Sequence, residues 1–147
     1  MNIKKMLDIL NRLDFFSDFT DQEKKIILSY NAQFCVFRDD EKIITMGELD
    51  AALFILLAGS VEVTLDDPDK PITILNPGDI IGEMSFLTEV PRTTNITAIE
   101  DVITLKIDNA MLNRLAIEIR EKIKDKVIQK LVSRLIKMNE EIISLTF

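Results

Sequence analysis

The sequence contains no histidine, no tryptophan and a single cysteine among its 147 residues. One cysteine excludes an internal disulfide, and the lack of histidine removes the usual ligand sets for zinc and copper. It also excludes acid–base catalysis by an imidazole. Cys35 lies in the apolar run 34–37. We interpret it as a buried small hydrophobic residue, because a reactive thiol needs an accessible, electropositive setting.

Positive charge and long apolar runs are also scarce. The chain has 18 Lys and Arg against 25 Asp and Glu, a formal net charge of −7. A nucleic-acid-binding protein needs basic surface to neutralise phosphates, so we do not expect DNA as a partner. The longest apolar run, residues 51–58, is too short to cross a bilayer, and the chain start does not resemble a signal peptide. We therefore expect a soluble, cytoplasmic protein without a membrane partner.

Apolar residues recur at spacings of three and four near the amino terminus, which predicts an amphipathic helix over residues 3–13. Thr20 and Glu23 then have the spacing of a capping box, in which the hydroxyl and the carboxylate each accept from the other's backbone N–H. This pair predicts the start of a second short helix that runs to about Tyr30.

The same apolar spacing returns in the last third of the chain. Asp108 or Asn109 can cap a helix that begins near Ala110, and the stripe continues to Leu145 without proline or glycine. Residues 118–124 can hold a bend between two helices. A second, offset stripe widens the apolar face beyond what packing on a sheet needs, and large exposed apolar patches usually mark partners.

Between these helical ends lie short runs rich in Val, Ile, Thr and Phe, separated by turns with Gly, Pro or Asp. The runs are residues 33–37, 42–46, 52–57, 61–65, 72–75, 95–99 and 102–107. In residues 61–65 apolar and polar side chains alternate, which predicts a strand with one wet face. Many short strands at this spacing indicate a mainly β fold, an antiparallel β-barrel or jelly roll with flanking helices.

The residues best suited to hold a ligand lie together in segment 82–94. Its one glycine, Gly82, lets a ligand approach the backbone, and the start of a short helix after it favours an anion. Arg92 carries a planar guanidinium that can bind two oxygens of one anion. Ser85 and Thr93 can donate to phosphate oxygens, and Glu83 can accept from a sugar hydroxyl. A small nucleotide with one phosphate charge would satisfy all of them.

Gly82-Glu83, followed ten residues after the glycine by Arg92 with Pro91 before it, resembles the phosphate-binding cassette of cyclic-nucleotide-binding domains. That family includes kinase regulatory subunits, gated channels and catabolite activator proteins. Three further glycines match the family's barrel glycines in order: Gly47, Gly59 and Gly78. The resemblance covers residues 13–145, nearly the whole chain.

The resemblance implies a role for each cassette residue. Glu83 would accept from the ribose 2′-hydroxyl, and Arg92 would pair with the cyclic phosphate beside Gly82. The backbone amides of Met84 and Ser85 would complete the anion site. The ligand would be cyclic AMP or cyclic GMP, with no other cofactor and no metal.

Two more positions are implied to face the base. Thr93 occupies a place where relatives that accept cyclic GMP often carry threonine, although cyclic-AMP binders also have serine or threonine there. Met138 and Asn139 on the last helix correspond to positions from which catabolite activators contact the base. The same helix resembles their dimer helix, so we expect a homodimer.

We therefore expect one non-enzymatic, stand-alone regulatory domain over residues 1–147, with N-terminal helices in 1–32, the barrel in 33–107 and C-terminal helices in 108–147. Its ligand state would act on an unidentified effector protein, unless the chain is a fragment of a longer protein. The alternative is a protein-interaction module whose cassette is vestigial or binds another anion. We interpret Asp66, Asp67 and Asp69 as a hairpin loop rather than a calcium site.

Overall fold

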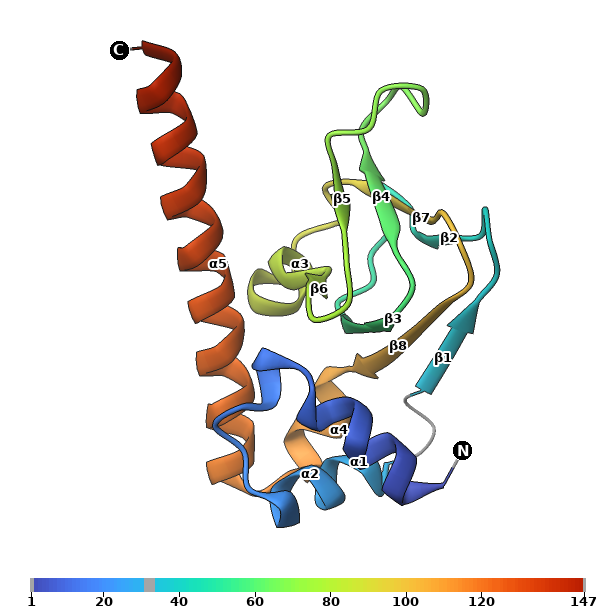
Figure 1. The fold of residues 1–147 in the computed structure, drawn as a ribbon, viewed down its shortest axis with the longest axis vertical. Coiled ribbons are helices and arrows are strands. Elements are labelled where there is room, and N and C mark those ends of the chain that lie inside the picture. The colour runs from blue at the N-terminus through green and yellow to red at the C-terminus, as the bar shows by residue number, and fades with distance from the viewer. Residues whose placement is uncertain (1, 31–33, 147) are drawn as a thin grey trace.

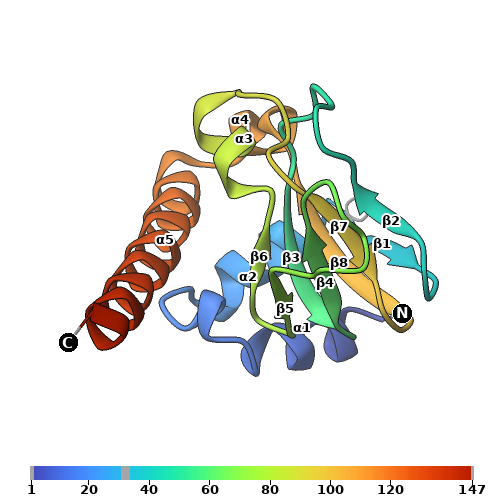
Figure 2. The same cartoon turned by 90° about the horizontal axis from the view of Figure 1, so that it is seen from above.

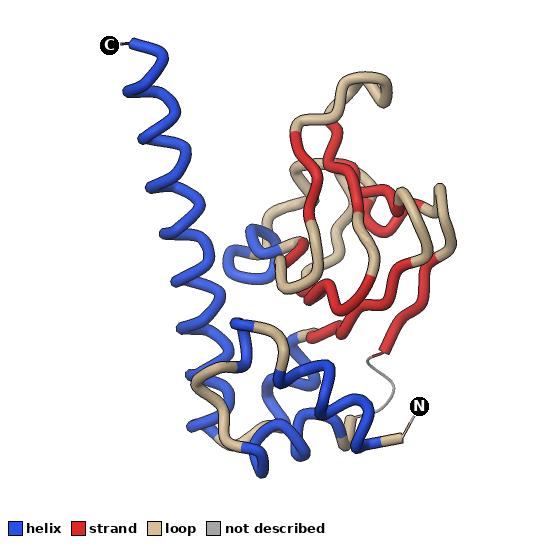
Figure 3. The backbone as a smooth tube through the Cα atoms, in the orientation of Figure 1, coloured by secondary structure: helices blue, strands red, loops and turns tan. Residues whose placement is uncertain are grey.

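The computed structural model describes residues 2–30 and 34–146, and it places helices at both ends of the chain around two β-sheets (Figures 1 and 3). The N-terminal helices lie against the lower sheet in Figure 1, and the last helix runs along one side of the molecule. In chain order the elements are α1 (Ile3–Asn11), η1 (Asp14–Phe16), α2 (Asp21–Leu28), β1 (Phe34–Phe37), β2 (Lys42–Ile44), β3 (Leu53–Ala58), β4 (Val61–Thr64), β5 (Thr73–Leu75), β6 (Ile80–Ile81), α3 (Glu83–Thr88), β7 (Asn95–Ala98), β8 (Val102–Ile107), α4 (Asn109–Arg114) and α5 (Ile117–Thr146).

The two sheets are antiparallel and four-stranded, in the orders β1-β8-β3-β6 and β2-β7-β4-β5. The protein has two hydrophobic cores, and alternate side chains of β3 pack into one or the other. Successive residues of a strand point to opposite faces. Ile55 packs with the helices in one core, whereas Phe54 and Leu56 pack against the other sheet. The jelly-roll prediction is confirmed in this two-sheet form, and the described strands do not close into a barrel.

The helix signals at the amino terminus are confirmed. Thr20 accepts from the Glu23 N–H, and the Glu23 carboxylate accepts from the Thr20 N–H, which completes the capping box of α2.

The predicted first strand also begins close to its expected place, although Gln33 lies outside the described residues. Asp108 caps α4 by accepting from the Met111 N–H.

The predicted bend within residues 118–124 is wrong. The break lies earlier, at Leu115, whose extended backbone (ψ 151°) ends α4 and whose side chain is buried in the core. From Ile117 to Thr146 the helix is continuous for 30 residues, which is about 45 Å of helix. Residues 118–124 are good helix formers, and nothing in them breaks the hydrogen-bond ladder.

Strand β6 was not predicted, because two residues are too few to show any alternation. Ile80 and Ile81 pair with Ile55 and Phe54 of β3, and both isoleucines are fully buried. This short pairing fixes the chain immediately before Gly82, the N-cap of α3. The position of the predicted cassette therefore depends on a strand that local sequence does not reveal.

The buried apolar residues of helix α5 all lie in its first half. Ile119, Ile123 and Val127 are buried in the core with the N-terminal helices. Beyond them the helix continues past α3, and its end lies far from the N-terminal helices in Figure 1. Figure 2, seen from above, shows α5 to one side of the two sheets. Of the described helices, none has the length and apolar character that a membrane span requires.

Candidate ligand-binding site

The cassette is built around a glycine that packs against an arginine. Gly82 has φ +81°, a left-handed conformation that disfavours other residues. A Cβ atom at this position would lie 2.3 Å from Nη1 of Arg92 and 2.9 Å from the carbonyl oxygen of Ala52. Both the conformation and the space therefore require glycine, since the Arg92 guanidinium lies where a side chain would be.

Arg92 is buried, with only 4 % of its surface exposed. Its Nη1 donates to the carbonyl oxygen of Gly82 at 3.1 Å, and its Nη2 donates to that of Ala52 at 2.8 Å. Its backbone is held as well, because its N–H donates to Glu48 and its carbonyl oxygen accepts from Gly47. The guanidinium is thus fixed in position before any ligand arrives.

Asp50 supplies the counter-charge for this buried arginine, with its carboxylate 3.2 Å from Nη2 of Arg92. Burial alone would raise the pKa of Asp50, but the Ala52 N–H and the charge of Arg92 outweigh it, so the pKa is lowered overall. Within the described residues the buried Nε of Arg92 has no acceptor. A buried donor without a partner is costly, so an acceptor for this N–H would be stabilising.

A pocket of about 140 Å³ opens beside these groups. Of the predicted site residues, six line it: Gly82, Glu83, Met84, Ser85, Arg92 and Thr93. Ser85 is buried, whereas Met84 and Thr93 are exposed at the rim. Asn139 does not line the pocket and is exposed on α5, so its contact with a base stays a prediction.

Arg134 of α5 also lines the pocket, and sequence reasoning missed it. Its Nη1 donates to Oε1 of Glu83 at 2.5 Å, so the predicted ribose acceptor already has a partner. The contact joins α3 to the last helix. The sequence signal for it is a basic residue at every fourth position from Lys122 to Arg134, because residues at this spacing lie on one side of a helix.

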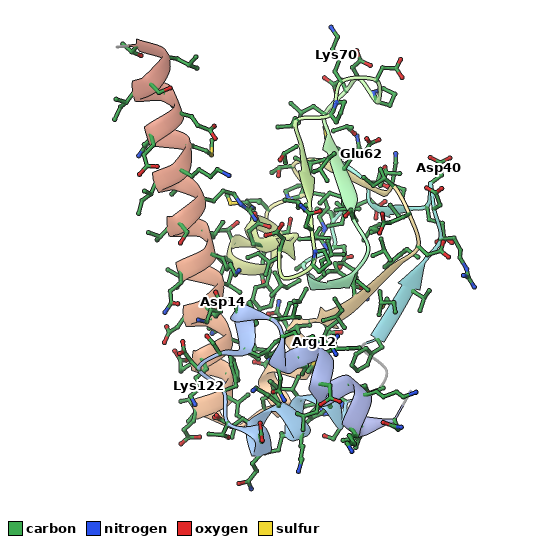
Figure 4. All side chains as sticks on the ribbon, in the orientation of Figure 1. Arg12, Asp14, Asp40, Glu62, Lys70 and Lys122 are labelled. Carbon is green, nitrogen blue, oxygen red and sulfur yellow. The ribbon has the colours of Figure 1, made fainter. Side chains whose placement is uncertain are left out.

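That basic series forms a ladder of ion pairs between α5 and the rest of the protein. Asp14 and Lys122, labelled in Figure 4, belong to its lower part. In order along α5 the pairs are Lys122–Glu23 at 2.6 Å, Lys126–Asp18 at 3.0 Å, Lys130–Asp14 at 3.9 Å and Arg134–Glu83 at 2.5 Å. The lower three pairs hold α5 to the N-terminal segment, and the last holds it to the cassette.

Acidic side chains in the β4–β5 hairpin take no part in this site. Asp66, Asp67 and Asp69 lie in the loop between these strands, where the Asp67 carboxylate accepts from the Asp69 N–H. Among residues 2–30 and 34–146 no group of three His, Cys, Asp or Glu is arranged to hold a metal ion.

Comparison with known proteins agrees with this geometry. The chain is 32 % identical over 104 residues to a CRP-like cAMP-activated global transcriptional regulator of Mycobacterium tuberculosis, which covers 69 % of this chain and 46 % of the relative. It is 29 % identical over 114 residues to a cGMP-dependent protein kinase of Toxoplasma gondii, covering 77 % of this chain and 11 % of the kinase. The chain therefore spans less than half the length of these curated relatives.

Solved structures share the fold. A cyclic nucleotide-binding domain from Methylobacillus flagellatus KT superposes with a TM-score of 0.80 at 24 % identity, covering 98 % of this chain and 84 % of that one. The catabolite activator protein of Thermus thermophilus gives a TM-score of 0.71 at 25 % identity, covering 90 % and 62 %. Residues 34–118 match the model of the cyclic nucleotide-binding domain, and the chain belongs to that family.

Proposed function

We propose that the pocket lined by Gly82, Arg92 and Arg134 binds cyclic AMP or cyclic GMP, and that the chain is a non-enzymatic regulatory domain. The observation that carries this proposal is the buried guanidinium of Arg92, which is fixed by two carbonyl oxygens and retains an unpartnered Nε at a pocket. A positive charge fixed in advance in a chain of net charge −7 suits an anionic ligand.

The lining residues suit the parts of a cyclic nucleotide. Arg92 would pair with the cyclic phosphate, and the first-turn amides around Met84 and Ser85, which have no acceptor within the helix, would add donors. Glu83 would accept from the ribose 2′-hydroxyl. Thr93, at the exposed rim, would lie near the base, where a hydroxyl can serve either purine.

The Arg134–Glu83 pair supplies a route from the ligand to α5. The pocket of about 140 Å³ is small beside the roughly 300 Å³ or more typical of ligand sites. A nucleotide that uses Glu83 must therefore share it with Arg134 or displace that side chain. A ligand shifts a conformational equilibrium only through its different affinity for the two states. The state of the pocket would in this way alter the position of α5.

We propose that α5 passes this signal to other chains, in a homodimer and to a separate effector protein. Support comes from the exposed apolar residues of its second half, including Leu135 and Ile142, which are more than half exposed. The acidic charge of the chain argues against DNA as a direct contact.

Titration calorimetry with cyclic AMP and cyclic GMP tests the proposal, using the chain freed of carried-over ligand. Arg92→Ala should abolish or strongly weaken binding, by about 2–5 kcal/mol, because it removes a buried charged partner. Arg38→Ala is the matched control, since Arg38 is an exposed arginine paired with Asp101. Circular dichroism checks that each variant folds.

Binding that Arg92→Ala removes and Arg38→Ala retains would establish a nucleotide sensor, and the tighter ligand would name its signal. No heat with either nucleotide from folded wild-type protein would overturn the proposal. The alternative function, a protein-interaction module with the same fold, would then remain.

A further inference from the structure

A groove separate from the nucleotide pocket lies between helices α3, α4 and α5. Its volume is about 430 Å³, within the roughly 300–1,000 Å³ of small-molecule sites. In Figure 1 α3 lies above α4, and α5 runs past both. The floor of the groove is apolar, because Phe86 and Leu112 belong to the core and Leu87 is only 36 % exposed. The rest of the lining is polar: Thr88, Glu89, Asn109 and Lys124.

Helix α3 separates this groove from the nucleotide pocket. Glu83, Met84 and Ser85, in the first turn of α3, line the pocket, whereas residues 86–89 at its other end line the groove. Among the described residues the two linings have none in common. A molecule in the groove would therefore occupy a second site.

Lys124 is the charged group of the groove that lacks a partner. Its side chain is half-buried, and within residues 2–30 and 34–146 it makes no ion pair or hydrogen bond. Lys122, Lys126 and Lys130 on the same helix each pair with an acidic residue of the N-terminal segment. A partly buried charge without a partner is costly, so an anion beside Lys124 would be stabilising.

Asn109 adds a second polar group to the groove. It is the first residue of α4 and half-buried, and its side-chain amide has no hydrogen bond in the described part of the chain. The amide NH₂ and the ammonium of Lys124 are both donors, so each can bind one oxygen of a carboxylate. Glu89, exposed at the edge of the groove, disfavours a ligand with a second negative charge.

We infer that this groove binds a small monocarboxylate with an apolar body. Its carboxylate pairs with Lys124 and Asn109, and its apolar part lies on the floor of the groove. The inference goes beyond the proposed function, and it holds whether or not the cassette binds a nucleotide.

The polar lining favours a small molecule over a segment of a partner protein. Each residue of an extended peptide brings one backbone donor and one acceptor, which need partners once they are buried. The Thr88 hydroxyl already donates to the carbonyl oxygen of Met84 at 2.6 Å. Lys124 and Asn109 are matched by a single carboxylate, whereas most of a buried peptide backbone would stay unpaired.

Titration of the nucleotide-free chain with octanoate, followed by NMR of the backbone amides, tests the inference. Octanoate should bind saturably at submillimolar concentration and shift the signals of residues 86–89, 109–112 and 124. Acetate lacks the apolar chain and 1-octanol lacks the carboxylate, so each should bind at least about tenfold more weakly.

The position of the shifted signals distinguishes the groove from two other surfaces. Shifts confined to residues 135–145 would place octanoate on the exposed apolar residues of α5. Shifts confined to Gly82 and Arg92 would place it in the nucleotide pocket. Either result, or the absence of binding, would overturn the inference.

Lys124→Gln tests the charged partner. The variant keeps most of the side-chain length but removes the charge, and it should weaken octanoate binding by about tenfold. Lys137→Gln removes the same charge at an exposed position of α5 outside the lining and should leave the affinity unchanged. Equal effects of the two variants would show that Lys124 makes no specific contact with the carboxylate.

Asn109→Asp tests the second group without changing its size. The new carboxylate should repel octanoate and weaken its binding by about tenfold or more. The variant should fold, because an acidic side chain in the first turn of a helix is favourable. Asn113→Asp, exposed on α4 outside the lining, is the control. An unchanged octanoate affinity in Asn109→Asp would contradict the inferred site.

Calorimetry with cyclic AMP and cyclic GMP on the same wild-type sample is a separate measurement. Octanoate binding without nucleotide binding would leave this inference standing and overturn the proposed function. Nucleotide binding without octanoate binding would do the reverse.

Discussion

Arg134 Nη1 donates to Glu83 Oε1 although the two residues are 51 positions apart, and this contact joins the cassette to the long C-terminal helix. Glu83 is the residue expected to bind the ribose, and α5 is the helix expected to pass on the signal, so the two are in direct contact. Under the proposed function, ligand binding and the position of α5 would depend on the same carboxylate, and the first prediction follows from this.

Arg134→Ala should raise nucleotide affinity, because Glu83 is then free before the ligand arrives. The pair is partly exposed, so we expect a gain of no more than about fivefold, corresponding to about 1 kcal/mol. Calorimetry measures the affinity. Lys137→Ala, on the same helix and exposed, is the control. A loss of affinity in Arg134→Ala would instead assign Arg134 a direct attractive contact with the ligand.

Gly82→Ala should abolish nucleotide binding, because the new Cβ collides with the Arg92 guanidinium and moves it. Gly47→Ala is a matched control: Gly47 also has a positive φ, +89°, but a Cβ there meets no atom within 4 Å. The backbone strain of about 1–2 kcal/mol is common to both variants. Urea unfolding should therefore show a larger loss of stability for Gly82→Ala, in which the collision adds to the strain, and only Gly82→Ala should lose binding. Equal nucleotide affinities of the two variants would show that binding does not require the Arg92 guanidinium to pack against Gly82.

Stability should fall with acidity through Glu23. A hydrogen bond from Lys122, followed by one from the Thr20 backbone, lowers the pKa of Glu23 below its ordinary value of 4.5. The stabilisation is fully present above pH 4.5 and is lost as pH falls through the lower, folded-state pKa. Glu23→Gln, which keeps a capping-box acceptor, should weaken this dependence in urea unfolding between pH 7 and 3. Glu118→Gln, an exposed carboxylate on α5, should not.

At Lys126, which pairs with Asp18, removing the charge should destabilise the protein less than shortening the side chain. Its side chain is buried while its partner Asp18 is exposed, so its methylene stem packs between α5 and the N-terminal segment. Lys126→Met keeps this packing and should change the unfolding free energy by less than about 1 kcal/mol. Lys126→Ala removes it and should cost about 2 kcal/mol. Thermal or urea unfolding of both variants makes the comparison, and a reversed order would assign the stability to the charge.

Local sequence was sufficient for features that depend on neighbouring residues. The capping box of Thr20 and Glu23 satisfies backbone groups within one turn, so its spacing alone predicts the helix start. The order of helices, strands and helices follows from the period of the apolar residues, which changes near residues 33 and 108. The cassette was recognisable because Gly82 and Arg92 keep a fixed separation.

What the tertiary structure alone decided depends on contacts between distant segments. Strand β6 is only two residues long and exists because β3 pairs with it. The break before α5 comes from burial of Leu115 rather than from a helix-breaking residue. Ala52, one of the partners of Arg92, lies 40 positions from it, and Arg134 lies 51 positions from Glu83, so no local period encodes these contacts. Periodicity shows that α5 has an apolar stripe, but only packing shows which part the core covers, since burial depends on the whole fold.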